Sequence, residues 1–185
     1  MHLRYRQERA TQAAAHLLKL RGGRMSYMKL LKLLYLADRR ALLMHGKPIT
    51  FDRYVSMDHG PVLSQTYNLM VAEEAPDQPT SYWRQHISEP QAGYEVTLRV
   101  DEPPDGQLSR AQTAILDEVF AEYGTMSRWE IVRFVHTLPE WEDPQGSSNP
   151  IALRSILHAG GLDEDDASAI EAELLAEQAL ASLLD

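Results

Sequence analysis

The stretch from Tyr27 to His45 constrains the fold of this chain more than any other part of it. A wide apolar arc appears at helical spacing, formed by Leu30, Leu31, Leu33, Leu34, Tyr35, Ala37, Ala41 and Leu42. An arc broader than the stripe of a surface helix has to be covered on several sides. The sequence therefore predicts a central helix around which the rest of the chain packs, with Leu30, Leu34, Ala37 and Ala41 nearly inaccessible.

Other periodic segments predict the elements around this helix. Helical spacing favours helices at 10–20, 61–74, 109–123, 127–138, 151–157 and 163–185, the last being acidic and amphipathic, with a short helical piece near 82. Alternating apolar and polar residues predict strands at 49–58 and 93–100, which we expect to pair. The predicted fold class is mainly α with a small antiparallel β-sheet (α+β), built as a compact helical core around one central helix.

The length of 185 residues suits one domain with extensions. We predict an N-terminal helix in residues 1–24, a core domain in 25–145 and a C-terminal extension in 146–185 that holds the acidic helix. No apolar run reaches the roughly 18 residues that cross a bilayer, and the N-terminus lacks the apolar segment of a secretion signal. A cytoplasmic protein without membrane contact is therefore expected.

The net charge of −9 conceals an asymmetry, because residues 1–60 carry twelve basic and four acidic side chains. Such polarity fits a nucleic-acid face, an acidic surface for a basic partner, or two parts of one fold that attract each other. Within the predicted central helix, a basic stripe opposite the apolar arc contains Lys29, Lys32, Arg39 and Arg40. That stripe is either a solvated face or a phosphate-binding one.

The motifs of common enzymes and cofactor sites are missing from the sequence. It contains no GxxxxGK[ST], GxGxxG, HExxH or GxSxG motif and no cysteine, and its seven histidines never pair at a spacing of four. We expect neither catalytic activity nor a cofactor or metal site. The three tryptophans, Trp83, Trp129 and Trp141, are expected in the core rather than on a nucleic-acid platform.

The stretch "YVSMDHGPV", residues 54–62, combines several residues that favour turns. Gly60 takes backbone angles closed to other residues, and Pro61 suits the first turn of a helix. We therefore predict a structural corner between a strand and a helix. His59 is expected to bond to the backbone there, because no nucleophile with a local signature accompanies it as a general base would require.

Four motifs in order, "KLLKLLYLAD" (29–38), "GKPI" (46–49), "DRYVSMDHGPV" (52–62) and "HTLPEW" (136–141), resemble the Panacea domain family. That family includes SocA-like and phage-associated antitoxins, and the resemblance spans about residues 25–145. It implies a mostly helical fold with a small sheet, and an antitoxin that neutralises a protein toxin by direct contact, without catalytic residues. Structural roles are expected for the motif residues Asp38, Gly46, Pro48, Gly60, Pro61, His136 and Trp141.

The leading hypothesis is thus a type II antitoxin with a cognate protein toxin as its partner. The alternatives are a DNA-binding regulator of its own operon, or an adaptor that delivers a toxin to a protease. Because interface hot spots favour Trp, Tyr and Arg, the toxin is expected on one patch formed by Arg53, Tyr54, His59 and Tyr67. Tyr54 is placed on the strand face opposite Val55 and Met57. The acidic C-terminal helix is the alternative docking site.

Overall fold

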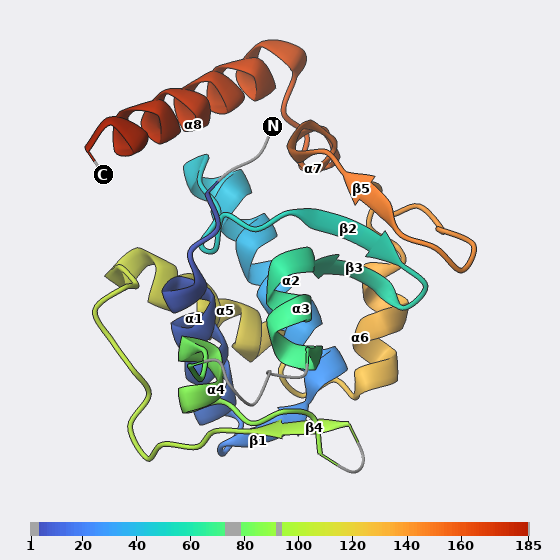
Figure 1. The fold of residues 1–185 in the computed structure, drawn as a ribbon. Helices are drawn as coiled ribbons and strands as arrows, with labels where there is room; N and C mark the ends of the chain where they lie inside the picture. Colours follow the sequence, from blue (N-terminus) through green and yellow to red (C-terminus); the bar gives the residue numbers. More distant parts are fainter. Residues whose placement is uncertain (1–3, 73–78, 92–93, 185) are drawn as a thin grey trace.

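The computed structural model describes residues 4–72, 79–91 and 94–184 (Figure 1). Its elements are α1 (Gln7–Leu20), β1 (Arg24–Ser26), α2 (Tyr27–His45), β2 (Tyr54–Met57), β3 (Gly60–Leu63), α3 (Ser64–Val71), α4 (Tyr82–His86), β4 (Glu95–Thr97), α5 (Arg110–Tyr123), α6 (Arg128–Val135), β5 (Asn149–Ile151), α7 (Leu153–Ala159) and α8 (Glu164–Leu184). The predicted fold class, mainly α with little antiparallel sheet, is confirmed.

Helix α2 runs through the middle of the molecule, and helices α1, α5, α6 and α7 pack around it together with β3 (Figure 1). Leu30, Leu34, Ala37 and Ala41 are each no more than 1% exposed, as predicted. The helix ends at Gly46, which adopts a left-handed φ of 66° while its N–H donates to the carbonyl of Leu42. The wide apolar arc of this helix is therefore covered on several sides.

The strands pair differently from the prediction. β2 lies between β3 and β5 in a three-stranded antiparallel sheet, whereas β4 pairs with β1 in a separate two-stranded sheet. The expected pairing of the 49–58 and 93–100 segments is wrong because β4 finds a closer partner in β1. With only three residues, β1 is too short to show an alternating pattern in the sequence.

Pro61 lies in strand β3 rather than in the first turn of a helix, so the predicted strand-to-helix corner is wrong. Residues 58–59 instead form the turn of a β2–β3 hairpin, in which Met57 pairs with Gly60 and Ser56 pairs with Pro61. Gly60 has a φ of 96°, which lets the chain reverse directly into a second strand. Helix α3 begins only at Ser64, after that strand ends.

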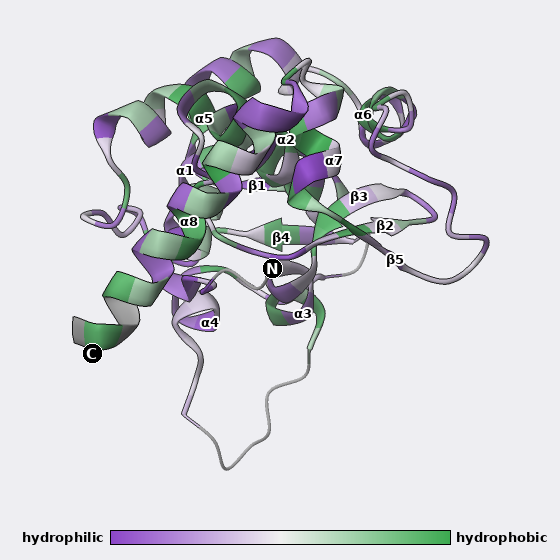
Figure 2. Cartoon of the chain, turned by 90° about the horizontal axis from the view of Figure 1, so that it is seen from above, coloured by the Kyte–Doolittle hydropathy of each residue, from purple (hydrophilic) through white to green (hydrophobic). Residues whose placement is uncertain are grey.

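Both ends of the chain contribute to the same hydrophobic core. Buried side chains come from α1 (Leu17 and Leu18), from α7 (Ile156 and Leu157) and from α8 (Ala167 and Leu174). Figure 2 shows hydrophobic and hydrophilic residues interspersed along α8, and its leucines Leu175, Leu180 and Leu183 are exposed, so its apolar residues are not confined to one covered side. Within the described ranges, no helix is long and apolar enough to cross a membrane.

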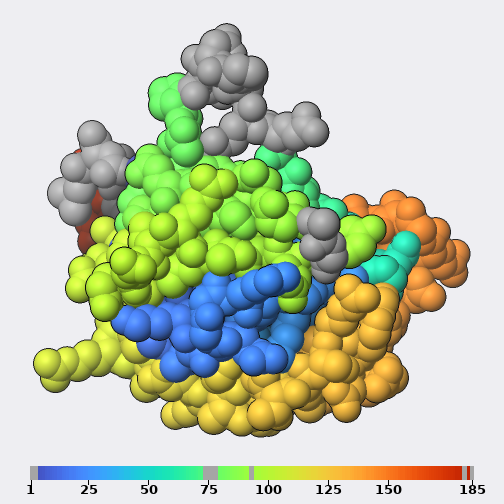
Figure 3. Space-filling view, turned by 90° about the horizontal axis from the view of Figure 1, so that it is seen from below, coloured from blue at the N-terminus to red at the C-terminus, as the bar shows by residue number. Residues whose placement is uncertain are grey.

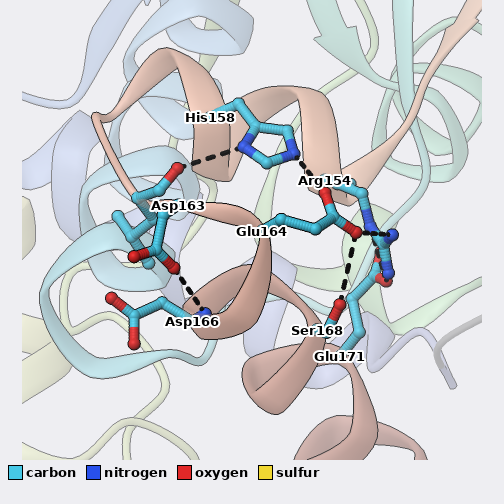
Figure 4. Close-up of polar contacts among 8 residues, drawn as sticks. Arg154, His158, Asp163, Glu164, Asp166, Ser168 and Glu171 are labelled. Carbon is cyan, nitrogen blue, oxygen red and sulfur yellow. Dashed lines mark hydrogen bonds and ion pairs between the residues drawn. The ribbon is translucent and has the colours of Figure 1, made fainter.

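Ionic contacts hold α8 against α7 (Figure 4). The guanidinium of Arg154 pairs with both Glu164 and Glu171. His158 contacts the carbonyl of Leu162 through Nδ1 at 3.0 Å and the carboxylate of Glu164 through Nε2 at 3.1 Å. These contacts join the start of α8 to α7 and neutralise part of its acidic charge.

Candidate partner-binding face

A buried lysine of α2 holds strand β3 of the β2–β3 hairpin. Lys32 of α2 is 1% exposed, and its Nζ donates to the carbonyls of Gly60 at 3.0 Å and Pro61 at 2.9 Å. Burial lowers the pKa of Lys32 to about 7. One buried amine therefore holds two carbonyls of the hairpin that follow it 28 and 29 residues later.

This lysine predicts a pH-dependent stability. Between pH 7 and its unfolded pKa near 10.5, Lys32 gives up its proton in the folded protein but keeps it in the unfolded chain, so stability rises with pH there. Relative to Lys32→Met, the wild-type free energy of unfolding is expected to increase by about 1 to 2 kcal/mol from pH 7 to pH 9, the ceiling being about 1.4 kcal/mol per pH unit. Urea denaturation at three pH values measures this difference, and parallel pH profiles of the two proteins would contradict it.

Asp38, the last residue of the "KLLKLLYLAD" motif, organises the segment that leads into β2. Its Oδ1 accepts from the backbone N–H groups of Ile49 and Thr50, both at 3.0 Å, and its Oδ2 accepts from the Thr50 hydroxyl at 2.6 Å and the Tyr54 hydroxyl at 3.3 Å. Burial raises the pKa of Asp38 to about 7, although the bonds from Thr50 and Ile49 act in the opposite direction. Its contacts are those of a structural residue.

The "HTLPEW" motif covers β2 from the other side. The rings of His136 and Trp141 stack with centroids 4.0 Å apart, and Trp141 Nε1 donates to the carbonyl of Met57 at 3.2 Å. Glu140 between them is buried and accepts from the Tyr35 hydroxyl at 2.9 Å and from Arg39 Nε at 2.6 Å. The pKa of His136 is lowered, first by burial and then by nearby positive charges. Sequence reasoning missed Glu140, whose only signal was its place inside the motif.

The four predicted partner-binding residues do not form one patch. The predicted exposure of Tyr54 is wrong: its side chain is 5% exposed, and its ring packs edge-on against Tyr35 at 5.8 Å. The side of the strand that carries Tyr54 is turned toward the core, because Asp38 offers the Tyr54 hydroxyl a buried acceptor. Val55, on the opposite side of the strand, is half-buried. Tyr54 therefore belongs to the core.

Among the described residues, no hydrogen bond, ion pair or ring contact joins the side chains of the other three to one another. Arg53 is exposed beside β5, and His59 is exposed at the hairpin turn. Tyr67 lies on α3 near Tyr27, whose pKa is raised by burial and then by Tyr67. Only His59 meets a neighbouring exposed aromatic residue among the described side chains.

That neighbour is Trp129 of α6, and together with Arg128 the two residues make what we call the hairpin face. The rings of His59 and Trp129 meet edge to face with centroids 5.7 Å apart, and the guanidinium carbon of Arg128 lies 5.2 Å from the Trp129 ring. Trp129 is 45% exposed, so its expected place in the core is wrong. The space-filling view shows the hairpin beside α6 and the segment before β5 (Figure 3).

The predicted basic stripe on α2 is also wrong. Lys29 is buried and donates to the carbonyls of Gly124 and Met126, and Lys32 is buried under the hairpin. Arg39 pairs with Glu140, and Arg40 pairs with Glu122 of α5. Because α2 is covered on this side as well, its cations are used inside the molecule, and the stripe offers no continuous phosphate-binding surface.

The charge asymmetry of the sequence is used in the same way. Basic residues of the first part of the chain pair with acidic residues of the later part, as in Lys19 with Glu102, Arg40 with Glu122, and Lys47 with Glu177. This pairing favours the interpretation that the two parts of one fold attract each other.

Comparison with known families explains why the motifs occur together. The family model described as "Antitoxin SocA-like, Panacea domain" matches residues 30–142. The chain belongs to this family. The Panacea match begins within α2 and ends just after Trp141, so it includes the hairpin, its supports Lys32 and Asp38, and the hairpin face. Neither the curated proteins nor the solved structures that were searched contain a match.

Proposed function

We propose that this protein is the antitoxin of a type II toxin–antitoxin system and neutralises a cognate protein toxin by binding it directly, not by catalysis. Membership of the SocA-like antitoxin family over residues 30–142 is the observation that carries this proposal. An antitoxin of this kind acts through its folded surface. The question for the structure is therefore which part of that surface holds the toxin.

The hairpin face has the properties of an interface anchor. Trp129 combines a large apolar ring with 45% exposure, and it contacts His59 and Arg128. Tryptophan and arginine are enriched among residues that dominate binding energy. We assign the toxin contact to this face, in place of the patch predicted around Tyr54.

Replacing Trp129 with alanine is expected to weaken toxin binding by roughly 30-fold or more, the effect of losing a hot spot of about 2 kcal/mol. His59→Ala removes the ring that packs against Trp129 and is expected to have a smaller effect in the same direction. The measurement is calorimetric titration with the cognate toxin, sought first among the products of the neighbouring genes, together with growth rescue in cells that express both.

Tyr94→Ala is the matched control, because Tyr94 is an aromatic residue 63% exposed on the opposite sheet, next to β4. It should leave binding unchanged. Equal losses in the Trp129 and Tyr94 variants would remove the hairpin face from the proposal, and full rescue by every variant would do the same. Immunoblots of the toxin during rescue distinguish masking from delivery to a protease, since masking leaves the amount of toxin unchanged.

A further inference from the structure

A second site lies on another part of the molecule, in a pocket beside Arg53. We infer that this pocket binds the carboxyl-terminal residue of a peptide chain when that residue has an apolar side chain. The inference does not rest on the proposed toxin contact, because none of the three residues of the hairpin face lines the pocket.

The pocket is a cavity of about 450 Å³ where β2 meets the segment that follows the family domain. Tyr54 and Val55 of β2 line one part of it, and residues 150–153 of β5 and α7 line another. Its volume lies in the usual range for ligand sites, about 300 to 1,000 Å³. Because its lining is supplied by both the Panacea domain and the C-terminal segment, the pocket exists only where the two are joined.

One cation at the pocket has no partner. The guanidinium of Arg53 is exposed and makes no ion pair or hydrogen bond with any other described residue. The carboxyl group of Asp52, by contrast, already accepts from the backbone N–H groups of Arg53, Gln65 and Thr66 and from the Thr66 hydroxyl. Each oxygen of Asp52 therefore already accepts two hydrogen bonds from within the protein, whereas the guanidinium of Arg53 remains available to a ligand.

The second acidic residue at the pocket also has a partner. Glu171 of α8 is largely buried and pairs with Arg154 of α7, which it shares with Glu164. Among the described residues that line the pocket, Arg53 is therefore the charged side chain without a partner. A guanidinium binds a carboxylate through paired hydrogen bonds, so the ligand expected here carries a carboxylate.

The remaining walls define the rest of the ligand. Val55, Pro150, Ile151 and Leu153 give the pocket a mostly apolar lining, which suits an aliphatic side chain. β5 is the outer strand of its sheet, so one of its edges has no strand partner within the described residues, and Pro150 at its centre has no N–H to donate. A peptide end offers the carboxylate, the apolar side chain and a backbone N–H donor for that edge in a single molecule.

Methyl NMR on the full-length protein tests this inference with acetyl-alanyl-alanyl-leucine as the probe. We expect the peptide acid to shift the methyl signals of Val55, Ile151 and Leu153. Its carboxamide should bind at least about tenfold more weakly, because a charge-assisted hydrogen bond is lost. Arg53→Gln should reduce the affinity for the acid to that for the amide and leave the amide unchanged.

Arg133→Gln is the matched control, since Arg133 is an exposed arginine on α6 and does not line the pocket. It should bind the acid as the wild type does. The inference is overturned if these methyl signals do not move, if acid and amide bind equally, or if Arg53→Gln has no effect. A third probe, 4-methylpentanoate, has the carboxylate and the aliphatic chain without the peptide. If this probe binds as tightly as the peptide acid, the ligand of the pocket is a small free acid and not a peptide end.

Discussion

Replacing Asp38 with alanine is expected to lower the free energy of unfolding by about 3 to 6 kcal/mol, because each buried donor left without an acceptor costs about 1 to 3 kcal/mol. The change leaves the N–H groups of Ile49 and Thr50 and the Thr50 hydroxyl without their acceptor inside the protein. Whole domains are stable by about 5 to 15 kcal/mol, so much of the stability of this fold depends on one carboxyl group. Urea denaturation followed by circular dichroism measures the loss.

Asp38→Asn provides the matched comparison. Its side-chain oxygen can still accept from Ile49 and Thr50, and its amide group can donate to the two hydroxyls after they rotate. We expect a loss of about 1 to 2 kcal/mol, near the cost of a single weakened bond. If asparagine and alanine destabilise the protein equally, accepting the backbone N–H groups is not the role of Asp38.

Gly60→Ala should also be severe, with an expected loss of about 2 to 5 kcal/mol. A Cβ at this position would lie 2.5 Å from Val135 Cγ2, and the φ of 96° is strained for any residue with a side chain. Backbone strain contributes about 1 to 2 kcal/mol and overpacking about 1 to 3 kcal/mol. The measurement is the urea midpoint and slope of the purified variant.

The two contributions can be separated with a second glycine. Gly106 has a φ of 90°, but a Cβ there meets no atom within 4 Å, so Gly106→Ala reports the strain alone. The loss in Gly60→Ala is expected to exceed the loss in Gly106→Ala by the overpacking contribution. Equal losses would show that Val135 moves away from the added methyl group without lowering the free energy of unfolding.

The parts of the fold that were predictable from sequence are those fixed by nearby residues. The length of α2, its left-handed end at Gly46 and the helix starts at Ser109 and Ser127 follow from periodicity and capping within a few positions. Both serines form capping boxes, so their signal is contained in four consecutive residues. Such signals need no knowledge of tertiary structure.

The wrong predictions concern residues whose partners are distant in sequence. The helical pattern predicts Lys29 as a surface cation, but its acceptors, Gly124 and Met126, follow 95 and 97 residues later. Strand alternation alone does not say which face is buried, so it predicts an exposed Tyr54, whereas the contact with Asp38 holds Tyr54 inside. Trp129 is predicted inside, although α6 turns it outward beside His59. For the hairpin face, therefore, His59 is a candidate from sequence, whereas Trp129 and Arg128 carry no signal that would join them to it.

The outer strand β5 limits where this protein can be truncated for experiments. β5 pairs with β2 through Ile151 and Tyr54, yet it lies beyond residue 142, where the match to the Panacea domain ends. A protein shortened to that boundary would carry a bare strand edge and would uncover the apolar surface that α7 now covers on α2. Such a fragment is prone to pair with its own copies, and a loss of the proposed partner binding in it would not distinguish self-association from a missing contact.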